Sequence, residues 1–315
     1  MAILQSAQSI FSIMLMIFLG YVLTSWKWFD ENSSKLLVNL VVKISLPLLM
    51  IHDLMNNFDR EKLLTSAGGL VVPFTSIALC YLLSFVVSEM AKIQTGRQGV
   101  FRSMFFNSNT IFMGLPINLA LFGEKSIPYV LLYYIANTVY FWTLGVYEIN
   151  RDGRDLPQKL FCLETVKQIL SPPLVSFLLA VVMIMLGIRL PSFIMDTFRY
   201  LGNLTTPISM LFIGITIHSI DLKTIRITKD MLVLFAGRFV ISPLSILLLA
   251  MVFPLPPLMR NVFVIQAAMP VMTNTAIVSK AYGADSEYVA VMITATTIAT
   301  IFVVPVYMAV LNIVK

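Results

Sequence analysis

Long apolar stretches separated by short polar gaps constrain this 315-residue chain more than any other feature. A helix that crosses the hydrocarbon core of a bilayer needs about 20 mostly apolar residues. Charged residues, Gly or Pro bound ten stretches of this kind, which predicts ten transmembrane helices. They cover approximately residues 8–26, 36–54, 66–90, 99–122, 127–149, 169–188, 198–219, 231–253, 260–282 and 287–312.

The composition excludes several other classes of protein. Apolar residues make up 58% of the chain and charged residues 12%, whereas about 25% of a soluble domain is charged. A cytosolic enzyme and a disordered chain are therefore both excluded. The basic residues are scattered through the gaps and form no patch for nucleic acid. Cys80 and Cys162 are too far apart to build a disulfide framework or a metal cage, and we expect neither a metal nor a cofactor.

The basic residues also predict an orientation. Lys and Arg are more frequent in the gaps that face the cytoplasm if the N-terminus lies outside. Short loops rich in Lys and Arg remain on the cytoplasmic side of a membrane. We therefore predict a multi-pass protein of the cell membrane with both termini outside.

Five apolar stretches precede the longest charged gap, 151–168, and five follow it. We interpret this gap as a cytoplasmic linker between two repeats, 1–150 and 169–315. Leu37-Val38-Asn39-Leu40 in the second stretch matches Leu201-Gly202-Asn203-Leu204 in the seventh. Because five crossings is an odd number, the second repeat enters the membrane from the opposite side. Inverted repeats of this kind are typical of secondary transporters.

The fourth and ninth stretches contain residues that break helices. The fourth includes Asn107-Ser108-Asn109-Thr110 followed by Gly114 and Pro116, and the ninth includes Gln266, Pro270 and Thr273-Asn274-Thr275. Irregular backbone is tolerated at membrane depth only inside protein or beside water. Paired interruptions at corresponding places in two repeats indicate a transporter's binding site. The alternative is that Pro and Gly make ordinary kinks and that Asn bonds across helices.

The chemistry of such breaks favours an anion. The first N–H groups of a half-helix carry partial positive charge, and Asn109 and Asn274 add amide donors. We therefore expect a carboxylate to bind here. The predicted substrate-binding residues are Asn107, Asn109, Gly114, Pro116, Arg238, Gln266, Pro270, Thr273, Asn274 and Thr275.

Ionisable residues inside the stretches are functional candidates. Arg238, in the eighth stretch, either balances a bound anion or is a snorkelling or buried structural side chain. Lys43 lies midway through the second stretch, and its role stays open. His52 and His218 lie near the ends of stretches, where interfacial positions are common, and their roles stay open.

Acidic residues lie only in gaps or near the ends of stretches. Asp53, Glu89 and Glu148 come closest to the centre of a stretch. A sodium or proton antiporter needs a carboxylate beside its broken helices, so that function is disfavoured. Proton coupling through Glu89 or Glu148 remains open.

The segment Asn109-Thr110-Ile111-Phe112-Met113-Gly114-Leu115-Pro116 resembles the fourth-helix signature of the auxin efflux carrier family. Gln266-Ala267-Ala268-Met269-Pro270 and Ala281-Tyr282-Gly283 resemble its ninth-helix pattern. That family includes plant PIN-type carriers and bacterial permeases for malate and similar acids. The short central gap is similar to that of the bacterial members. Plant members tend to carry a second Pro where this chain has Asn274-Thr275, so the ninth helix departs from their pattern.

The resemblance implies an all-α fold of ten helices in two inverted five-helix repeats. Helices one, two, six and seven form a scaffold that dimerises, and helices three to five and eight to ten form a transport domain. Broken helices four and nine cross in that domain, which moves like an elevator against the scaffold. The resemblance also implies that Asn109 binds the substrate carboxylate and that Gly114 and Pro116 shape the crossing.

We therefore expect a secondary carrier of small organic anions such as malate, malonate or auxin-like acids. Its expected partners are the carboxylate substrate, the lipid bilayer and a second copy of the chain. An ion-coupled symporter or antiporter of the same fold is the main alternative, and a receptor built on that fold is another. A membrane-embedded enzyme is disfavoured, because the stretches hold no constellation of nucleophile and base or metal ligands.

Overall fold

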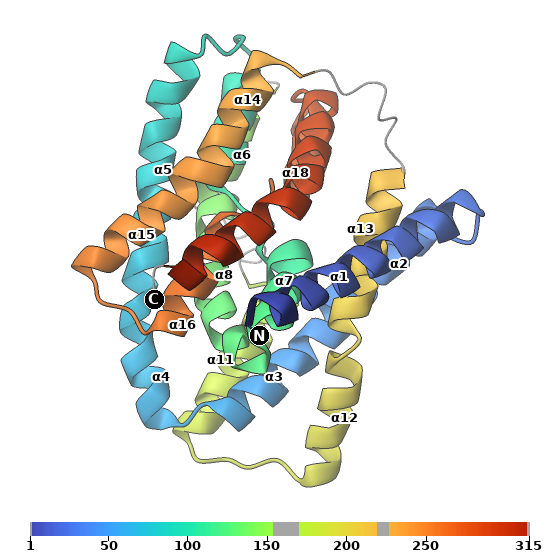
Figure 1. The fold of residues 1–315 in the computed structure, drawn as a ribbon, viewed down its shortest axis with the longest axis vertical. Coiled ribbons are helices and arrows are strands. Elements are labelled where there is room, and N and C mark those ends of the chain that lie inside the picture. The colour runs from blue at the N-terminus through green and yellow to red at the C-terminus, as the bar shows by residue number, and fades with distance from the viewer. Residues whose placement is uncertain (1, 154–169, 219–226, 314–315) are drawn as a thin grey trace. The chain divides into compact units, whose positions relative to one another are not determined.

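The computed structural model describes residues 2–153, 170–218 and 227–313. These residues are mostly helical, and the one β-type pairing recorded among them is an isolated bridge between Ser108 and Val271 (Figure 1). The predicted all-α architecture is therefore confirmed for the described part of the chain. Most of the predicted linker 151–168 lies outside the described residues, and so does Cys162.

Six helical runs within the described residues are long and apolar enough to cross a membrane. Shorter apolar helices coincide with the first, fourth and sixth predicted stretches, and the ninth stretch is interrupted. A multi-pass membrane protein is thus supported, whereas ten crossings arranged as an inverted repeat remain a prediction. The six runs are Asn32–Asn57, Arg60–Met90, Glu124–Asp152, Ser192–His218, Lys229–Val252 and Ser286–Leu311.

The chain folds into two compact units, each assembled from segments that are far apart in the sequence. Unit 1 comprises 1–69, 111–132 and 170–220, and unit 2 comprises 70–110, 133–169 and 221–315. The chain passes between the units at 69/70, 110/111 and 132/133 as well as in the two undescribed segments. Residues on the two sides of the fourth stretch therefore belong to different units.

Unit 1 contains the helices of the first, second, sixth and seventh stretches. Many begin with favourable residues: Asp30 accepts a hydrogen bond from the Ser33 N–H at the start of α2, and Pro occupies the first turn of α3, α7 and α11, where its missing N–H costs nothing. Its elements are α1 (Ala2–Ser25), α2 (Glu31–Leu40), the π-helix η1 (Val41–Ser45), α3 (Leu46–Asn57), α4 (Arg60–Ala67), α7 (Leu115–Phe122), η4 (Glu124–Ser126), α11 (Pro172–Met185), α12 (Ser192–Gly202) and α13 (Thr205–His218).

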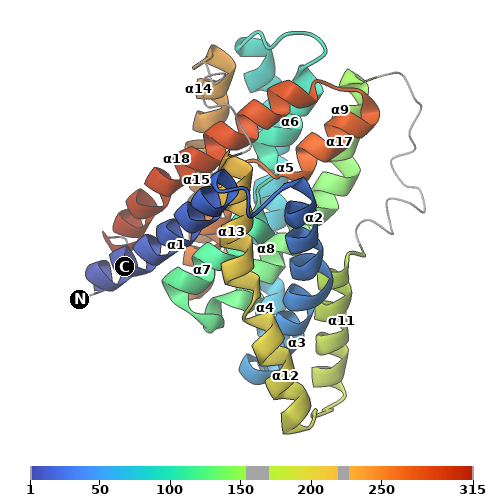
Figure 2. The same ribbon diagram turned by 90° about the vertical axis from the view of Figure 1, so that its right-hand side faces the viewer.

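Two glycines let α1 and α13 approach closely. A Cβ atom added to Gly20 would overlap the Leu211 carbonyl, and one added to Gly214 would overlap the Ile17 carbonyl. The two helices lie side by side in both views (Figures 1 and 2). Close packing through small residues is the usual way in which membrane helices associate, because lipid provides no hydrophobic drive between them.

Unit 2 contains nearly all of the third stretch, the first part of the fourth, most of the fifth, and the eighth, ninth and tenth. It carries the bridge between Ser108 and Val271. Its helix α14 is capped by Thr228, whose hydroxyl accepts a hydrogen bond from the Met231 N–H. Its elements are η2 (Gly68–Leu70, at the boundary), α5 (Val71–Met90), α6 (Gln98–Phe106), most of α8 (Ile127–Tyr140), η5 (Phe141–Gly145), α9 (Val146–Asp152), α14 (Lys229–Ala236), the π-helix η7 (Gly237–Ile241), α15 (Ser242–Val252), α16 (Pro257–Ala267), α17 (Asn274–Tyr282) and α18 (Ser286–Ile313).

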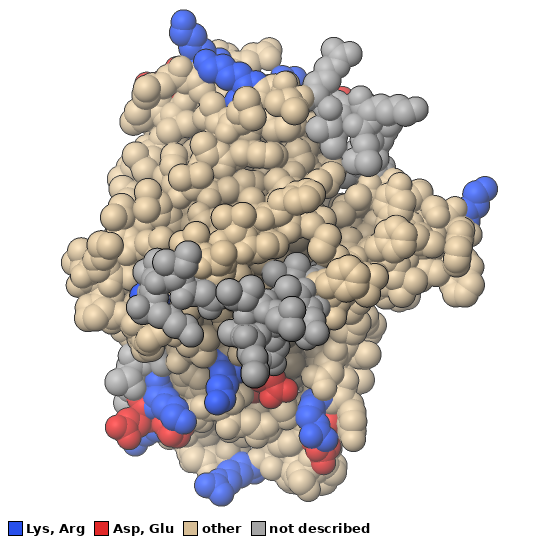
Figure 3. All heavy atoms as spheres, viewed as in Figure 1, with Lys and Arg blue, Asp and Glu red and all other residues tan. Residues whose placement is uncertain are grey.

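Wide areas of the surface carry no charged side chain, as the tan regions of Figure 3 show. Large apolar side chains on these helices are exposed, including Phe18 (62%), Met251 (81%) and Phe302 (70%). A soluble monomer rarely exposes apolar surface on this scale. Hydrocarbon in contact with these side chains is the environment that the surface fits.

We predict that Gly214→Ala destabilises the protein by about 1–3 kcal/mol, which is the usual cost of forcing extra atoms into a packed interior. The matched control is Gly68→Ala, because a Cβ atom at Gly68 meets nothing within 4 Å. Thermal unfolding in detergent measures both. Equal melting temperatures for the two variants would show that the contact between α1 and α13 is not tight.

Candidate functional site

The fourth stretch is broken where its Asn residues cluster. Helix α6 ends at Phe106, and Asn107, Ser108 and Asn109 are not helical. The chain then enters the π-helix η3 (Thr110–Gly114) and continues as α7. Pro116 lies in the first turn of α7, so it shapes the start of the second half-helix without removing a helical hydrogen bond.

The ninth stretch is broken in the same manner. Helix α16 ends at Ala267, residues 268–273 are not helical, and α17 begins at Asn274. Pro270 lies in the middle of this interruption. Since Pro has no N–H to donate and clashes with the preceding turn, it disfavours a regular helix at this position.

The two interruptions lie against each other in unit 2. Ser108 and Val271 form an antiparallel bridge, and the Asn109 N–H donates a hydrogen bond of 2.8 Å to the Pro270 carbonyl. The two extended segments thus satisfy part of each other's backbone. This matters because an unpaired polar backbone group is costly at membrane depth.

Arg238, from η7, holds the carbonyl ends of both broken helices. Its side chain is fully buried. Its Nη1 donates to the Phe105 carbonyl (3.1 Å) at the end of α6, and its Nη2 donates to the Ala267 carbonyl (2.9 Å) at the end of α16. Nε and Nη2 both donate to the Met269 carbonyl, and Nη2 also contacts the Ser108 hydroxyl.

The charge of Arg238 suits this position. The C-terminal end of a helix carries about half a negative elementary charge, and α6 and α16 both end at the guanidinium. One cation therefore compensates two helix ends that face each other. The donors of Arg238 engage protein carbonyls, so the structure gives this residue an organising role, and its predicted contact with substrate remains untested.

Asn137, from α8, fixes the other side of the first break. Its Oδ1 accepts a hydrogen bond from the Ser108 N–H (2.8 Å) and its Nδ2 donates to the Ser108 carbonyl (3.0 Å). The second break is held by Thr296 of α18, whose hydroxyl accepts a hydrogen bond from the Val271 N–H (3.2 Å). Gln266 connects the two, since its Nε2 donates to the Thr110 carbonyl (3.3 Å).

Sequence reasoning missed Ser108, Asn137 and Thr296. The available signals were the polar pair Asn137-Thr138 within the fifth stretch and the run of Thr residues in the tenth. A single Asn in a membrane helix usually indicates a bond to a neighbouring helix. Nothing in the sequence shows that this neighbour is the broken segment itself.

The predicted binding residues differ in burial. Asn107, Asn109, Gln266, Pro270 and Thr275 are buried. Thr273 and Asn274, at the start of α17, are half-buried, as is Met272. Gly114 and Pro116 are buried within unit 1. The accessible part of the second break is therefore the segment 272–274.

The acidic residue nearest the centre of unit 2 is engaged in an ion pair. Glu148 is 1% exposed, and its Oε2 lies 3.3 Å from Nη1 of Arg102. Its Oε1 accepts a hydrogen bond from the Tyr81 hydroxyl (3.0 Å). The guanidinium of Arg102 also stacks over the Phe85 ring, 4.2 Å from its centroid. Glu89, by contrast, is exposed.

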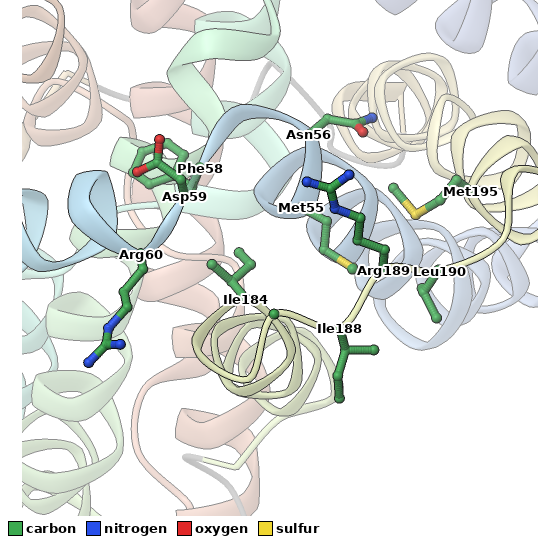
Figure 4. Close-up of a pocket in the computed structure, with 11 residues that line it drawn as sticks. Met55, Asn56, Phe58, Asp59, Arg60, Ile184, Ile188, Arg189, Leu190 and Met195 are labelled. Atoms are coloured by element: carbon green, nitrogen blue, oxygen red, sulfur yellow. The ribbon is translucent and has the colours of Figure 1, made fainter.

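Unit 1 contains a separate cavity of about 480 Å³, shown in Figure 4. It lies between the turn that joins α3 to α4 and the connection between α11 and α12. None of the predicted substrate-binding residues lines it. Its walls are formed by Met55, Asn56, Phe58, Asp59, Arg60, Ile184, Gly187, Ile188, Arg189, Leu190 and Met195.

The described residues contain no group of three or more His, Cys, Asp or Glu side chains placed to hold a metal ion. The polar groups at the two breaks are amides, hydroxyls and one guanidinium. This set recognises an anion or a neutral polar group better than a cation.

We predict that Arg238→Lys lowers stability by about 3–5 kcal/mol, the usual cost of disrupting a buried charged network. A Lys ammonium donates from one point and cannot span the carbonyls at the ends of α6 and α16. The melting temperature in detergent measures the effect. A variant as stable as the wild type would show that the guanidinium does not hold the break together.

We also predict that Asn137→Leu destabilises unit 2 by about 1–3 kcal/mol, because it leaves the Ser108 N–H without its acceptor. The Ser108 carbonyl keeps its hydrogen bond from the Thr110 N–H (3.0 Å). Thr143→Val is the matched control, since the Thr143 hydroxyl donates to the Val139 carbonyl within its own helical run. Hydrogen exchange at 107–110 measures the local effect. Unchanged protection of this segment in Asn137→Leu would contradict the assignment.

Comparisons with known proteins identify the family of this chain. A family model described as "Membrane transport protein" matches residues 6–308. An uncharacterized transporter of Methanocaldococcus jannaschii is 23% identical over 296 residues, which cover 93% of this chain and 94% of that protein. An uncharacterized transporter of Methanothermobacter thermautotrophicus is 23% identical over 319 residues, which cover 99% of this chain and 100% of that protein. The chain is a membrane transporter and belongs to the membrane transport protein family, the auxin efflux carrier family that its motifs resemble.

Proposed function

We propose that this protein is a secondary transporter of small organic anions, namely carboxylates such as malate, malonate or auxin-like acids. The observation that carries the proposal is the pair of helix breaks in unit 2, joined by the Ser108–Val271 bridge and held by buried Arg238. Paired breaks in membrane helices are where secondary transporters bind their substrates.

The electrostatics of the breaks favour an anion. Arg238 compensates the negative ends of α6 and α16. The starts of the second half-helices carry partial positive charge, which Arg238 does not neutralise and which attracts an anion. Helix α17 begins at Asn274, and Thr273 and Asn274 are half-buried. Helix N-termini are favourable positions for carboxylates. We propose that the substrate carboxylate lies against the start of α17.

The donors of the individual side chains refine the predicted site. The Nδ2 of Asn107 donates to the Ser103 carbonyl and the Nε2 of Gln266 donates to the Thr110 carbonyl. These two amides are therefore engaged in holding the break. We propose that Asn109, which the family resemblance assigns to the substrate carboxylate, contacts the substrate together with Thr273, Asn274 and Thr275. Asn107, Gln266, Pro270 and Arg238 shape the site around it, and the roles of Gly114 and Pro116, which lie in unit 1, stay predictions.

An elevator-type mechanism is supported by the way the chain divides. Unit 1 contains the stretches that the resemblance assigns to a scaffold, and unit 2 contains most of those assigned to a transport domain. Residues 111–132 depart from this assignment, because they group with unit 1. We propose that unit 2 carries the substrate past unit 1, and that unit 1 also forms a homodimer in the cell membrane.

The main alternative is coupling to sodium or protons at the break itself. The segments 107–110 and 268–275 contain no Asp, Glu or His, and a coupling cation normally needs such a group beside the broken helices. Transport of the anion alone, or coupling through a group elsewhere, agrees better with this composition.

We predict that Asn109→Ala reduces substrate uptake about 10- to 100-fold, which corresponds to one hydrogen bond to a charged group. The substitution keeps the backbone bond from Asn109 to Pro270, so the break should remain folded. The control is Asn203→Ala, an exposed Asn at the end of α12. The measurement is uptake of labelled malate, malonate and indole-3-acetate into proteoliposomes.

Two results would contradict the proposal in different ways. Failure of the wild type to take up any carboxylate would argue against the proposed substrate class. Normal uptake by Asn109→Ala, with both variants as stable as the wild type, would remove Asn109 from the site and leave the substrate class standing.

A further inference from the structure

His52, Asp53 and Asn56 form a hydrogen-bonded chain on α3 of unit 1. Nδ1 of His52 lies 2.7 Å from Oδ1 of Asp53, and Nε2 of His52 lies 2.9 Å from Nδ2 of Asn56. A carboxylate only accepts and an amide nitrogen only donates. Nδ1 therefore carries the proton and Nε2 accepts from Asn56, which makes the imidazole neutral in this arrangement.

The pair is buried, and its charge is not balanced by this neutral histidine. Asp53 is 1% exposed and His52 is 7% exposed, and Oδ2 of Asp53 has no hydrogen-bond partner among the described residues. An ionised carboxylate taken out of water is costly unless it is paired with a charge. A second proton on the imidazole would supply that charge at a distance of 2.7 Å.

The charged groups on the surrounding elements do not supply the positive charge that a buried Asp53 carboxylate requires. Glu124 of η4 acts on Asp53 with a further negative charge. Helix α11, which packs against α3, has no titratable residue. On α12, Asp196 and Arg199 pair with each other at 3.1 Å.

Two more titratable side chains lie on these neighbours. Tyr200 of α12 is exposed, and so is Lys43 of η1. Neither engages the pair in a hydrogen bond or ion pair recorded among the described residues. Among these neighbouring side chains, the imidazole of His52 is the one that contacts the Asp53 carboxylate and can bind a proton.

The cavity of unit 1 reaches this chain through Asn56. Asn56 lines the cavity, and its amide nitrogen rests on Nε2 of His52. Figure 4 shows Asn56 and Met55 near the end of α3, where both line the cavity. A volume of about 480 Å³ with polar groups in its wall has room for several water molecules.

We propose that His52 and Asp53 form a proton-binding site in unit 1 that is loaded from the cavity past Asn56. A hydronium ion in the cavity transfers its proton to Nε2 of His52 and remains as water. The new N–H bond converts the pair from a net charge of −1 to a neutral ion pair. The Asn56 amide turns over, so that its Oδ1 accepts from the new Nε2–H.

This site binds a proton away from the helix breaks, in the unit that does not carry the substrate. Its effect on transport rests on the proposed anion transport, whereas proton binding itself does not. If unit 2 carries an anion, a proton bound in unit 1 changes the charge of the unit against which it moves. The rate of transport would then depend on pH through a residue that does not touch the substrate.

The test is ¹⁵N NMR of the full-length protein labelled at histidine, in detergent micelles at a series of pH values. The chain has two His residues, so His218→Gln leaves the signal of His52 alone. We expect His52 to show the Nδ1–H tautomer at high pH and to take up one proton in a single step. A His52 imidazole that binds no second proton over the whole pH range in which the protein stays folded would overturn the proposal.

Two matched variants sharpen this test. Asn56→Asp places a carboxylate on Nε2 and should move the midpoint of the His52 titration up by about 1–3 pH units. Asn57→Asp adds the same charge one residue further along, where the native amide donates instead to the Asp53 backbone carbonyl. Its midpoint should move by less than half as much. Equal shifts in both variants would show that Asn56 has no special access to the imidazole.

Uptake measurements separate the proton site from the transport proposal. In proteoliposomes, Asp53→Asn should flatten the pH dependence of carboxylate uptake without abolishing uptake. If the wild type takes up carboxylate and the pH profile of Asp53→Asn is unchanged, protonation of this site does not control the rate of transport. The proposal of anion transport would still stand. If the wild type transports no carboxylate, the NMR titration still decides whether the proton site exists.

Discussion

The contact between the Arg238 guanidinium and the carbonyl ends of α6 and α16 is the interaction on which the centre of unit 2 depends. Two helices that stop at membrane depth leave carbonyl groups that water cannot reach. Arg238 donates to Phe105 and Ala267 at those ends, and its charge offsets both helix dipoles. A neutral side chain would satisfy some of these carbonyls without offsetting the dipoles. The buried Arg238 cation thus stabilises both helix breaks.

The rest of the break is held by bonds that leave its backbone little freedom. Asn137 holds both backbone groups of Ser108, and Thr296 accepts from Val271. A site that is rigid before its ligand arrives loses less entropy on binding. The half-buried start of α17 can therefore present Thr273 and Asn274 in a fixed position. This arrangement agrees with a site that moves as one body with its substrate.

The sequence predicted the helical fold and the places where helices stop, because Pro270 and the cluster from Asn107 to Asn109 act locally. It could not predict partners that lie far away in the chain. For Arg238 the sequence leaves open an anion partner or a buried structural role, because composition does not show where a buried donor points; in the structure its donors engage carbonyls. His52 looked interfacial until its bond to Asp53 was visible. The inverted repeat and the ten crossings stay predictions.

The antiparallel bridge between Ser108 and Val271 has a consequence for how transporters of this kind diversify. Main-chain donors at Ser108, Asn109 and Val271 are already committed to Asn137, Pro270 and Thr296. Under the proposed function, discrimination among substrates consequently falls to the side chains of Asn109, Thr273, Asn274 and Thr275. Replacing those few side chains would change the substrate that is bound, while the hydrogen-bonded backbone of the two breaks stays the same. Evolution can then retune selectivity in small steps, without refolding the core of the carrier.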